Sequence, residues 1–158
     1  MNPIIVYYTE TGNTTDVAET MAAAMRADLK TADAATAADF KSRPLIGLGS
    51  GIYTLGHVPQ VLRLVPNLPE GCRVFIFSTS GTAGWMKPSA FWFTHWRLRR
   101  ALRSRKVNLL GEWECPGQVK RGVLAWFGLF RGRPNDADLS SAAQFALQMA
   151  EKARDMGS

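Results

Sequence analysis

Near the N-terminus the sequence reads Pro3-Ile-Ile-Val-Tyr-Tyr8, followed directly by Thr9-Glu-Thr-Gly-Asn-Thr14. The first run is short, apolar and rich in β-branched and aromatic residues, which is typical of a strand buried on both faces. The apolar side chains that follow recur at helical spacing, so a helix is expected over 14–29. A buried strand that passes through a Thr/Gly/Asn loop into a helix indicates an α/β fold.

Strand-like and helix-like segments alternate along the rest of the chain. Further strands are expected at 29–34, 44–49, 72–77 and 107–115, and further helices after residue 57, at 89–105 and at 138–156, the last with Leu147 on its buried stripe. Strands separated by helices form parallel sheets through right-handed crossovers. The order therefore predicts one domain over 1–158, a three-layer, doubly wound α/β fold with a five-stranded parallel sheet. In such sheets ligands bind at the carboxyl ends of the strands.

The loop after the first strand has the chemistry of a phosphate site. Amide groups at a helix start are unpaired donors, and the helix dipole favours an anion there. Gly12 allows a tight turn, and the hydroxyls of Thr9, Thr11 and Thr14 can add hydrogen bonds. The loop has no Lys or Arg and matches neither the Walker loop nor the Gly-x-Gly-x-x-Gly fingerprint. The simpler alternative is a turn with a helix cap.

Two later segments strengthen the phosphate interpretation. Gly47-Leu-Gly-Ser-Gly-Ile-Tyr53 follows the third expected strand, and Ser78-Thr-Ser-Gly-Thr82 follows the fourth. With the first loop, they resemble the flavodoxin family over nearly the whole chain. The resemblance implies the strand order 2-1-3-4-5 and noncovalently bound FMN, with Trp85 in place of a tyrosine that the last loop lacks. The residues it implies as FMN contacts are Thr9, Glu10, Thr11, Gly12, Asn13, Thr14, Ser50, Gly51, Ile52, Tyr53, Thr79, Ser80, Gly81, Thr82 and Trp85.

The resemblance also implies a function. We expect an FMN-binding electron-transfer protein in which the cofactor carries the chemistry, with no catalytic side chain and no metal. The alternative is a flavodoxin-like oxidoreductase that acts on a quinone or porphyrin-type substrate at a membrane face. His57 follows the second of these loops; it could contact the flavin, but an exposed cap or surface residue is the simpler expectation.

Basic charge is concentrated in the second half of the chain. The whole sequence carries a formal +6, whereas 87–133 holds eleven cations, two acids and four of the five tryptophans, a net +9, with the fifth, Trp85, just before it. Flavodoxins that act as soluble carriers are usually acidic, so we expect a redox partner protein with an acidic face or a membrane-associated redox enzyme, including peripheral membrane contact. Alternatively, the aromatics pack on the sheet and the cations form a solvated face. No nucleic-acid-binding module is recognised, so no nucleic-acid partner is expected.

Length and composition exclude several classes of protein. A chain of 158 residues that is 46% hydrophobic and 20% charged is neither disordered nor fibrous. Cys72 and Cys115 fall at opposite ends of the predicted sheet, so no disulfide is expected between them. No signal peptide is recognised, and we expect a cytoplasmic protein that is peripheral to the membrane if the basic segment docks there.

Overall fold

The structure is a computed structural model that describes residues 2–53, 56–81, 94–118 and 132–156. Its strands and helices alternate as the sequence predicts. In chain order they are β1 (Ile4–Tyr8), α1 (Asn13–Met25), β2 (Asp28–Thr31), the 3-10 helix η1 (Ala37–Phe40), β3 (Ile46–Tyr53), β4 (Gly56–His57), α2 (Pro59–Leu62), the 3-10 helix η2 (Val65–Asn67), β5 (Arg73–Ser80), α4 (Trp96–Ser104), β6 (Asn108–Pro116) and α6 (Asp136–Asp155).

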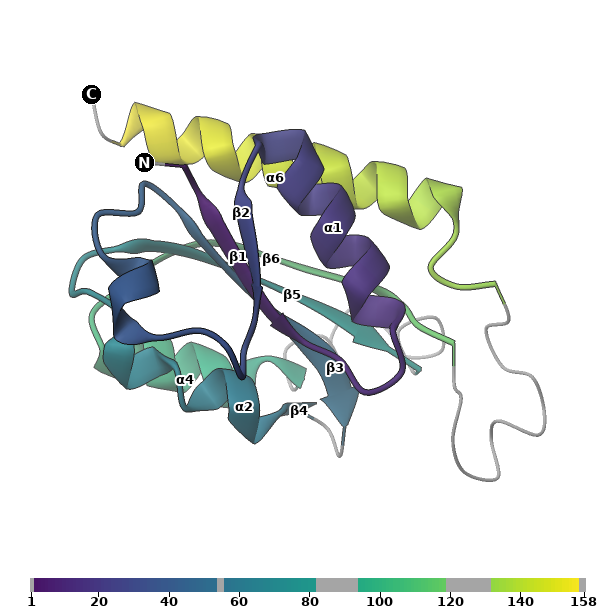
Figure 1. The fold of residues 1–158 in the computed structure, drawn as a ribbon, viewed down its shortest axis with the longest axis horizontal. Helices are drawn as coiled ribbons and strands as arrows, with labels where there is room; N and C mark the ends of the chain where they lie inside the picture. The colour runs from purple at the N-terminus through teal and green to yellow at the C-terminus, as the bar shows by residue number, and fades with distance from the viewer. Residues whose placement is uncertain (1, 54–55, 82–93, 119–131, 157–158) are drawn as a thin grey trace.

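Five parallel strands form the central sheet in the order β2-β1-β3-β5-β6. This is the order 2-1-3-4-5 when the parallel strands are counted along the chain, so the predicted topology is confirmed. The two-residue strand β4 pairs antiparallel with the end of β3, which the sequence did not predict. Helices α1 and α6 cover one face of the sheet, and α2 and α4 cover the other (Figure 1).

The first strand is buried on both faces, as predicted. Residues 4–7 of β1 are at most 8% exposed. Because side chains alternate along a strand, Ile4 and Val6 pack in the core between the sheet and the α2–α4 layer, whereas Ile5 and Tyr7 pack in the core beneath α1 and α6. The apolar run in the sequence therefore supplies both cores of the three-layer fold.

Several element boundaries differ from the prediction. Helix α1 ends at Met25, earlier than expected, because Arg26 adopts the left-handed conformation with φ 52° and its N–H bonds to the carbonyl of Ala23. Strands β3 and β5 continue through 50–53 and 78–80, which were predicted as loops, because neighbouring strands extend alongside them. Of the helix predicted at 89–105, residues 89–93 lie outside the described part of the chain.

Helix α6 has a different buried stripe from the predicted one. Leu147 is 51% exposed, so its predicted burial is wrong. The stripe that faces the sheet consists of Ala142, Ala146, Met149 and Ala153. Small alanines allow the helix to approach α1, against which it packs. In the part of the chain that the structure describes, no helix has the length and apolar character needed to cross a membrane.

Gly49 in β3 is required by the packing of Phe77 from the neighbouring strand. A Cβ atom at Gly49 would lie 2.1–2.5 Å from three atoms of the buried Phe77 ring. We expect Gly49→Ala to lower the free energy of unfolding by about 1–3 kcal/mol through overpacking, measured by urea denaturation. Gly56→Ala is the control, since its Cβ would meet only ordinary contacts at 3.9–4.0 Å. Equal effects of the two substitutions would contradict this packing argument.

Candidate functional site

The three segments singled out in the sequence lie at one edge of the sheet. In the strand register Tyr8 is beside Ser50, and Ser50 is beside Ser78. The loop after β1, the last residues of β3 and the last residues of β5 are therefore neighbours at the carboxyl ends of adjacent parallel strands. This edge is where a doubly wound sheet binds its ligand.

The loop from Thr9 to Gly12 presents a helix start without a side-chain cap. Gly12 has φ 88°, a conformation that favours glycine, and its N–H donates to Thr9 Oγ1 at 3.0 Å. Because the N-cap residue is a glycine, the N-cap position supplies no side-chain hydrogen bond to the first turn of α1. Amide groups in that turn point toward the loop and can donate to an anion, while the helix dipole adds a favourable field. The loop therefore fits the phosphate that the sequence predicts.

Two residues of the predicted phosphate loop hold it in place. Asn13 and Thr14 are buried, at 8% and 1% exposure. Asn13 Nδ2 donates to the carbonyl of Gln118 at 2.8 Å, and Thr14 Oγ1 lies 2.9 Å from Thr79 Oγ1. These bonds connect the loop to β5 and to the chain after β6. Both side chains already form hydrogen bonds within the protein. Asn13 and Thr14 would therefore contact a phosphate through their backbone amides.

The other predicted flavin contacts are placed in part. Glu10 is exposed and Thr11 half-buried in the loop, Gly51 and Ile52 lie in β3, Thr79 and Ser80 are buried in β5, and Gly81 follows it half-buried. The side chain of Tyr53 lies outside the described residues, as do Thr82 and Trp85. Their predicted contacts with the flavin stay predictions.

His57 is buried, so the expectation of an exposed residue is wrong. The β4 pairing sets His57 opposite Ile52 and brings its Nδ1 to 2.8 Å from Ser50 Oγ. The side chain is 3% exposed, and within the described part of the chain its Nε2 has no hydrogen-bond partner. Burial, with a smaller contribution from His95, lowers the pKa of His57 well below 6.5. The imidazole is therefore neutral at pH 7.

A second histidine forms a chain of hydrogen bonds beside the first. Ser78 Oγ lies 2.8 Å from His95 Nε2, and His95 Nδ1 lies 3.0 Å from Glu112 Oε2. Arg99 binds the same carboxylate with two donors, Nε at 2.7 Å and Nη2 at 2.6 Å. The rings of His57 and His95 are 4.8 Å apart between centroids. We call these residues, with Ser50, the histidine network; it connects β3, β4, β5, β6 and α4 behind the candidate site.

The carboxylate of Glu112 is strongly stabilised by this network. Burial alone would raise its pKa, but the hydrogen bonds from His95 and Arg99 outweigh burial and hold the pKa at about 2. Hydroxyl, imidazole and carboxylate here follow the order of a hydrolytic triad. Ser78 and His95 are, however, fully buried. The network is thus a structural support in which the serine is inaccessible to a substrate.

Sequence reasoning missed the histidine network. Its members come from four strands and the start of α4, and no spacing in the chain relates them all. The only local signal is that each serine is a polar residue at the end of an apolar strand. Among the residues that the structure describes, no group of three or more His, Cys, Asp or Glu side chains could hold a metal ion, and both Cys72 and Cys115 are free thiols.

The burial of His57 makes stability depend on pH. As pH falls through 6.5, the unfolded chain binds a proton at this imidazole while the folded chain does not. The free energy of unfolding should therefore fall below pH 6.5 by up to about 1.4 kcal/mol per pH unit. His57→Asn, whose amide can still reach Ser50, should remove this component in urea denaturation between about pH 7.5 and 5.5. Identical pH profiles for the two proteins would show that His57 is not the group responsible.

A similar protein is known from an archaeon. The chain is 32% identical over 136 residues to "Uncharacterized protein MJ0298" of Methanocaldococcus jannaschii, and the match covers 85% of this chain and 87% of that one. No protein-family model matches the chain.

Solved structures with the same fold include flavodoxins. An archaeal flavodoxin superposes with a TM-score of 0.70 at 17% identity, covering 98% of this chain and 99% of the other. Oxidised flavodoxin 2 from Bacillus cereus gives 0.67 at 19% identity, covering 96% and 99%. Rubredoxin oxygen:oxidoreductase from Desulfovibrio gigas gives 0.68 at 14% identity, covering 98% of this chain but 37% of that protein. At these identities the likeness establishes the fold.

Proposed function

The chain belongs to the same family as MJ0298 of Methanocaldococcus jannaschii and has the flavodoxin fold, and we propose that it is an FMN-binding electron-transfer protein. The observation that carries the proposal is the uncapped start of α1. It follows a left-handed Gly12, at the edge where β1, β3 and β5 end side by side. The neutral amide and hydroxyl donors of this loop suit the terminal phosphate of FMN, which needs hydrogen-bond donors on all sides.

The residues that would hold the cofactor have separate tasks. The amides of the first turn of α1 and the hydroxyls of Thr9 and Thr11 would bind the phosphate. The bond between Thr14 and Thr79 keeps this loop against the end of β5, where the ring is expected. When bound, FMN supplies one- and two-electron redox chemistry. The protein's own part would be to bind and orient the cofactor.

We favour an electron-transfer protein that has no substrate of its own over a reductase that acts on a quinone or porphyrin. In the described part of the chain, the arrangement that most resembles catalytic machinery is the Ser78–His95–Glu112 part of the histidine network. Its hydroxyl and imidazole are fully buried, so neither can contact a substrate. The rigid network supports the ends of β3 and β5 instead. Turnover of a small soluble quinone by the FMN-loaded protein would favour the reductase.

A titration with two flavins tests the proposal. We expect the protein to quench FMN fluorescence with one binding site per chain. Riboflavin, which lacks the phosphate, should bind at least tenfold more weakly, because charge-assisted hydrogen bonds contribute about 1.5–3 kcal/mol each. FMN whose fluorescence is unchanged by excess protein would contradict the proposal. Equal affinities for FMN and riboflavin would contradict the assignment of the phosphate to the 9–14 loop.

A further inference from the structure

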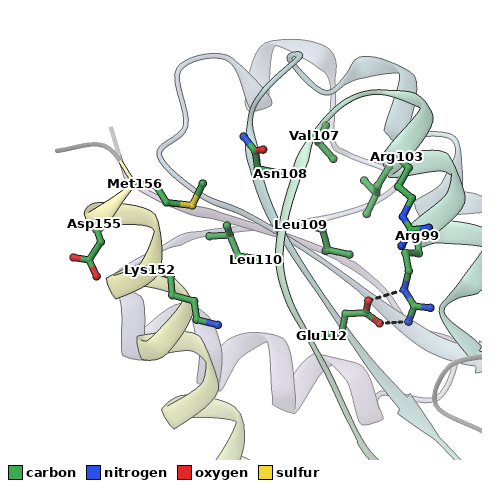
Figure 2. A pocket seen from close by; sticks show the side chains of 11 residues that line it. Arg99, Arg103, Val107, Asn108, Leu109, Leu110, Glu112, Lys152, Asp155 and Met156 are labelled. Atoms are coloured by element: carbon green, nitrogen blue, oxygen red, sulfur yellow. Dashed lines mark hydrogen bonds and ion pairs between the residues drawn. The ribbon is translucent and has the colours of Figure 1, made fainter. Parts of the chain in front are cut away.

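We propose that the outer edge of β6 is a docking site for an extended, acidic segment of a partner protein, which adds to the sheet as a further strand. The site is a groove of about 1010 Å³ between α4 and α6, with β6 as its floor. Figure 2 shows Arg99 and Arg103 entering from α4, Lys152 and Met156 from α6, and Leu109 and Leu110 between them. The proposal does not depend on FMN binding.

The groove lies away from the proposed flavin site. The β6 residues that line it belong to the first half of that strand, and the residues from the α6 side lie at the end of that helix. These are the amino ends of the parallel strands, whereas the proposed flavin loops follow their carboxyl ends. A partner bound here leaves the flavin edge open for electron exchange.

The floor of the groove is the outer edge of β6, and no strand in the described part of the chain lies beside it. Strand β6 pairs with β5, and among the described strands no other pairs with it. Within the described residues its outer N–H and C=O groups therefore pair with no other strand, and an edge of this kind is the usual template for strand addition. Residues 107–112 extend over about 20 Å. An extended peptide can form hydrogen bonds with these backbone groups of β6. A bound helix would leave the same groups without partners.

The charge of α4 indicates an acidic partner. The nine-residue helix contains four arginines and no acidic residue, and three of the arginines lie in its first five residues, toward its positive end. Arginines three or four residues apart, such as Arg99 with Arg103 and Arg100 with Arg103, repel each other by about 0.2–0.5 kcal/mol per pair. Cations near a helix start add a further penalty. A helix with this arrangement gains stability when carboxylates approach it.

One carboxylate of the protein itself already offsets part of the positive charge of α4. Glu112 binds Arg99. For Arg100, Arg103 and Lys152, no carboxylate lies within ion-pair distance among the described residues. Arg100 and Arg103 form one stripe with Trp96, whose side chain is 46% exposed, and the three residues line a second depression with Arg99. Carboxylates along this stripe would complete the charge balance.

The two walls of the groove predict the pattern of the partner sequence. Successive side chains of an added strand point to opposite faces of the sheet. One set would face the arginines of α4, and the other would face the α6 side, where Leu110 and the 55% exposed Met156 lie beside Lys152 and Asp155. Alternating acidic and apolar residues match the arginines of the first wall and the apolar side chains of the second. A second copy of this chain is disfavoured, because pairing two β6 edges would bring two sets of arginines together.

The test uses a defined peptide. We expect a labelled, capped peptide with four Glu-Val repeats to bind the full-length protein saturably in fluorescence anisotropy, and a Lys-Val peptide of equal length not to bind. Arg103→Glu should weaken binding at least tenfold, whereas Lys41→Glu, an equal charge change at an exposed site on another element, should not. Methylation of alternate peptide amides should also weaken binding at least tenfold, since it removes hydrogen bonds to β6. Arg100→Glu should weaken binding while leaving the fold at least as stable.

Several outcomes would overturn the docking site. The first is that the Glu-Val peptide does not bind. The second is that it binds, but that neither methylation of its amides nor Arg103→Glu weakens the binding. Binding to phosphatidylglycerol vesicles without binding to the peptide would replace the protein partner by a membrane. A dimer in light scattering whose β6 amides are protected from exchange would replace it by a second copy. FMN quenching measured in the same samples reports separately on the proposed cofactor.

Discussion

Glu112→Ala is expected to lower the free energy of unfolding by about 2–4 kcal/mol. The substitution leaves the Arg99 guanidinium and His95 Nδ1 without the carboxylate that binds both. Removing one partner of a fully buried ion pair costs about 3–5 kcal/mol. The Glu112 side chain is 15% exposed and lines the groove, so water reduces the cost. Urea denaturation at neutral pH measures the change.

An exposed glutamate provides the matched control for Glu112. Glu70 pairs with Lys106 at 3.1 Å, with both side chains more than half exposed. Glu70→Ala should change stability by less than about 1 kcal/mol, because exposed pairs contribute little. The double variant Glu112→Leu with Arg99→Leu should recover part of the loss, since no unpaired charge is left. A loss for Glu112→Ala as small as that for Glu70→Ala would contradict the supporting role of the histidine network.

Thr11→Asp is expected to weaken FMN binding by roughly 100-fold or more. The new carboxylate would stand beside the α1 start, within a few ångströms of the bound phosphate. Two unit charges 4 Å apart at an effective dielectric constant of 20 repel by about 4 kcal/mol. FMN fluorescence quenching measures the change. The repulsion should decrease in high salt, where screening is stronger.

Ser104→Asp is the control for the added charge. Ser104 is exposed at the end of α4, next to the amino end of β6. The substitution Ser104→Asp changes the net charge by the same amount as Thr11→Asp, but at the opposite end of the sheet from the 9–14 loop. FMN affinity should stay within twofold of the unchanged protein. Equal losses for Thr11→Asp and Ser104→Asp would point to overall charge and contradict the location of the phosphate site.

The fold was predictable because its signals are local. The apolar run of β1 is long enough to be buried on both faces, and the alternation of strands and helices leaves few topologies. The boundaries were less predictable. Residues 50–53 and 78–80 have turn-like composition, yet adjacent strands pair with them. Leu147 matched the helical period of a buried stripe, but the stripe is rotated toward Met149, which fills the space over Gly111.

The candidate site was predictable only in part. The phosphate loop could be identified because a glycine, hydroxyl groups and a helix start occur together within a few residues. The burial of His57 depends on a short antiparallel pairing that no local pattern predicts. Contact between His95 and Glu112 depends on the register of β6 against β5, which contains a bulge between Val74 and Phe75. Such contacts follow from tertiary structure.

The visible spectrum of the purified protein tests the central proposal most directly. After incubation with FMN and removal of free flavin by gel filtration, the protein should be yellow and show the absorption bands of oxidised flavin. Dithionite should bleach these bands, and air should restore them, because bound FMN accepts and returns electrons. The Thr11→Asp variant should elute colourless, and Ser104→Asp should elute yellow. An unsubstituted protein that elutes colourless after incubation with excess FMN would contradict the proposal.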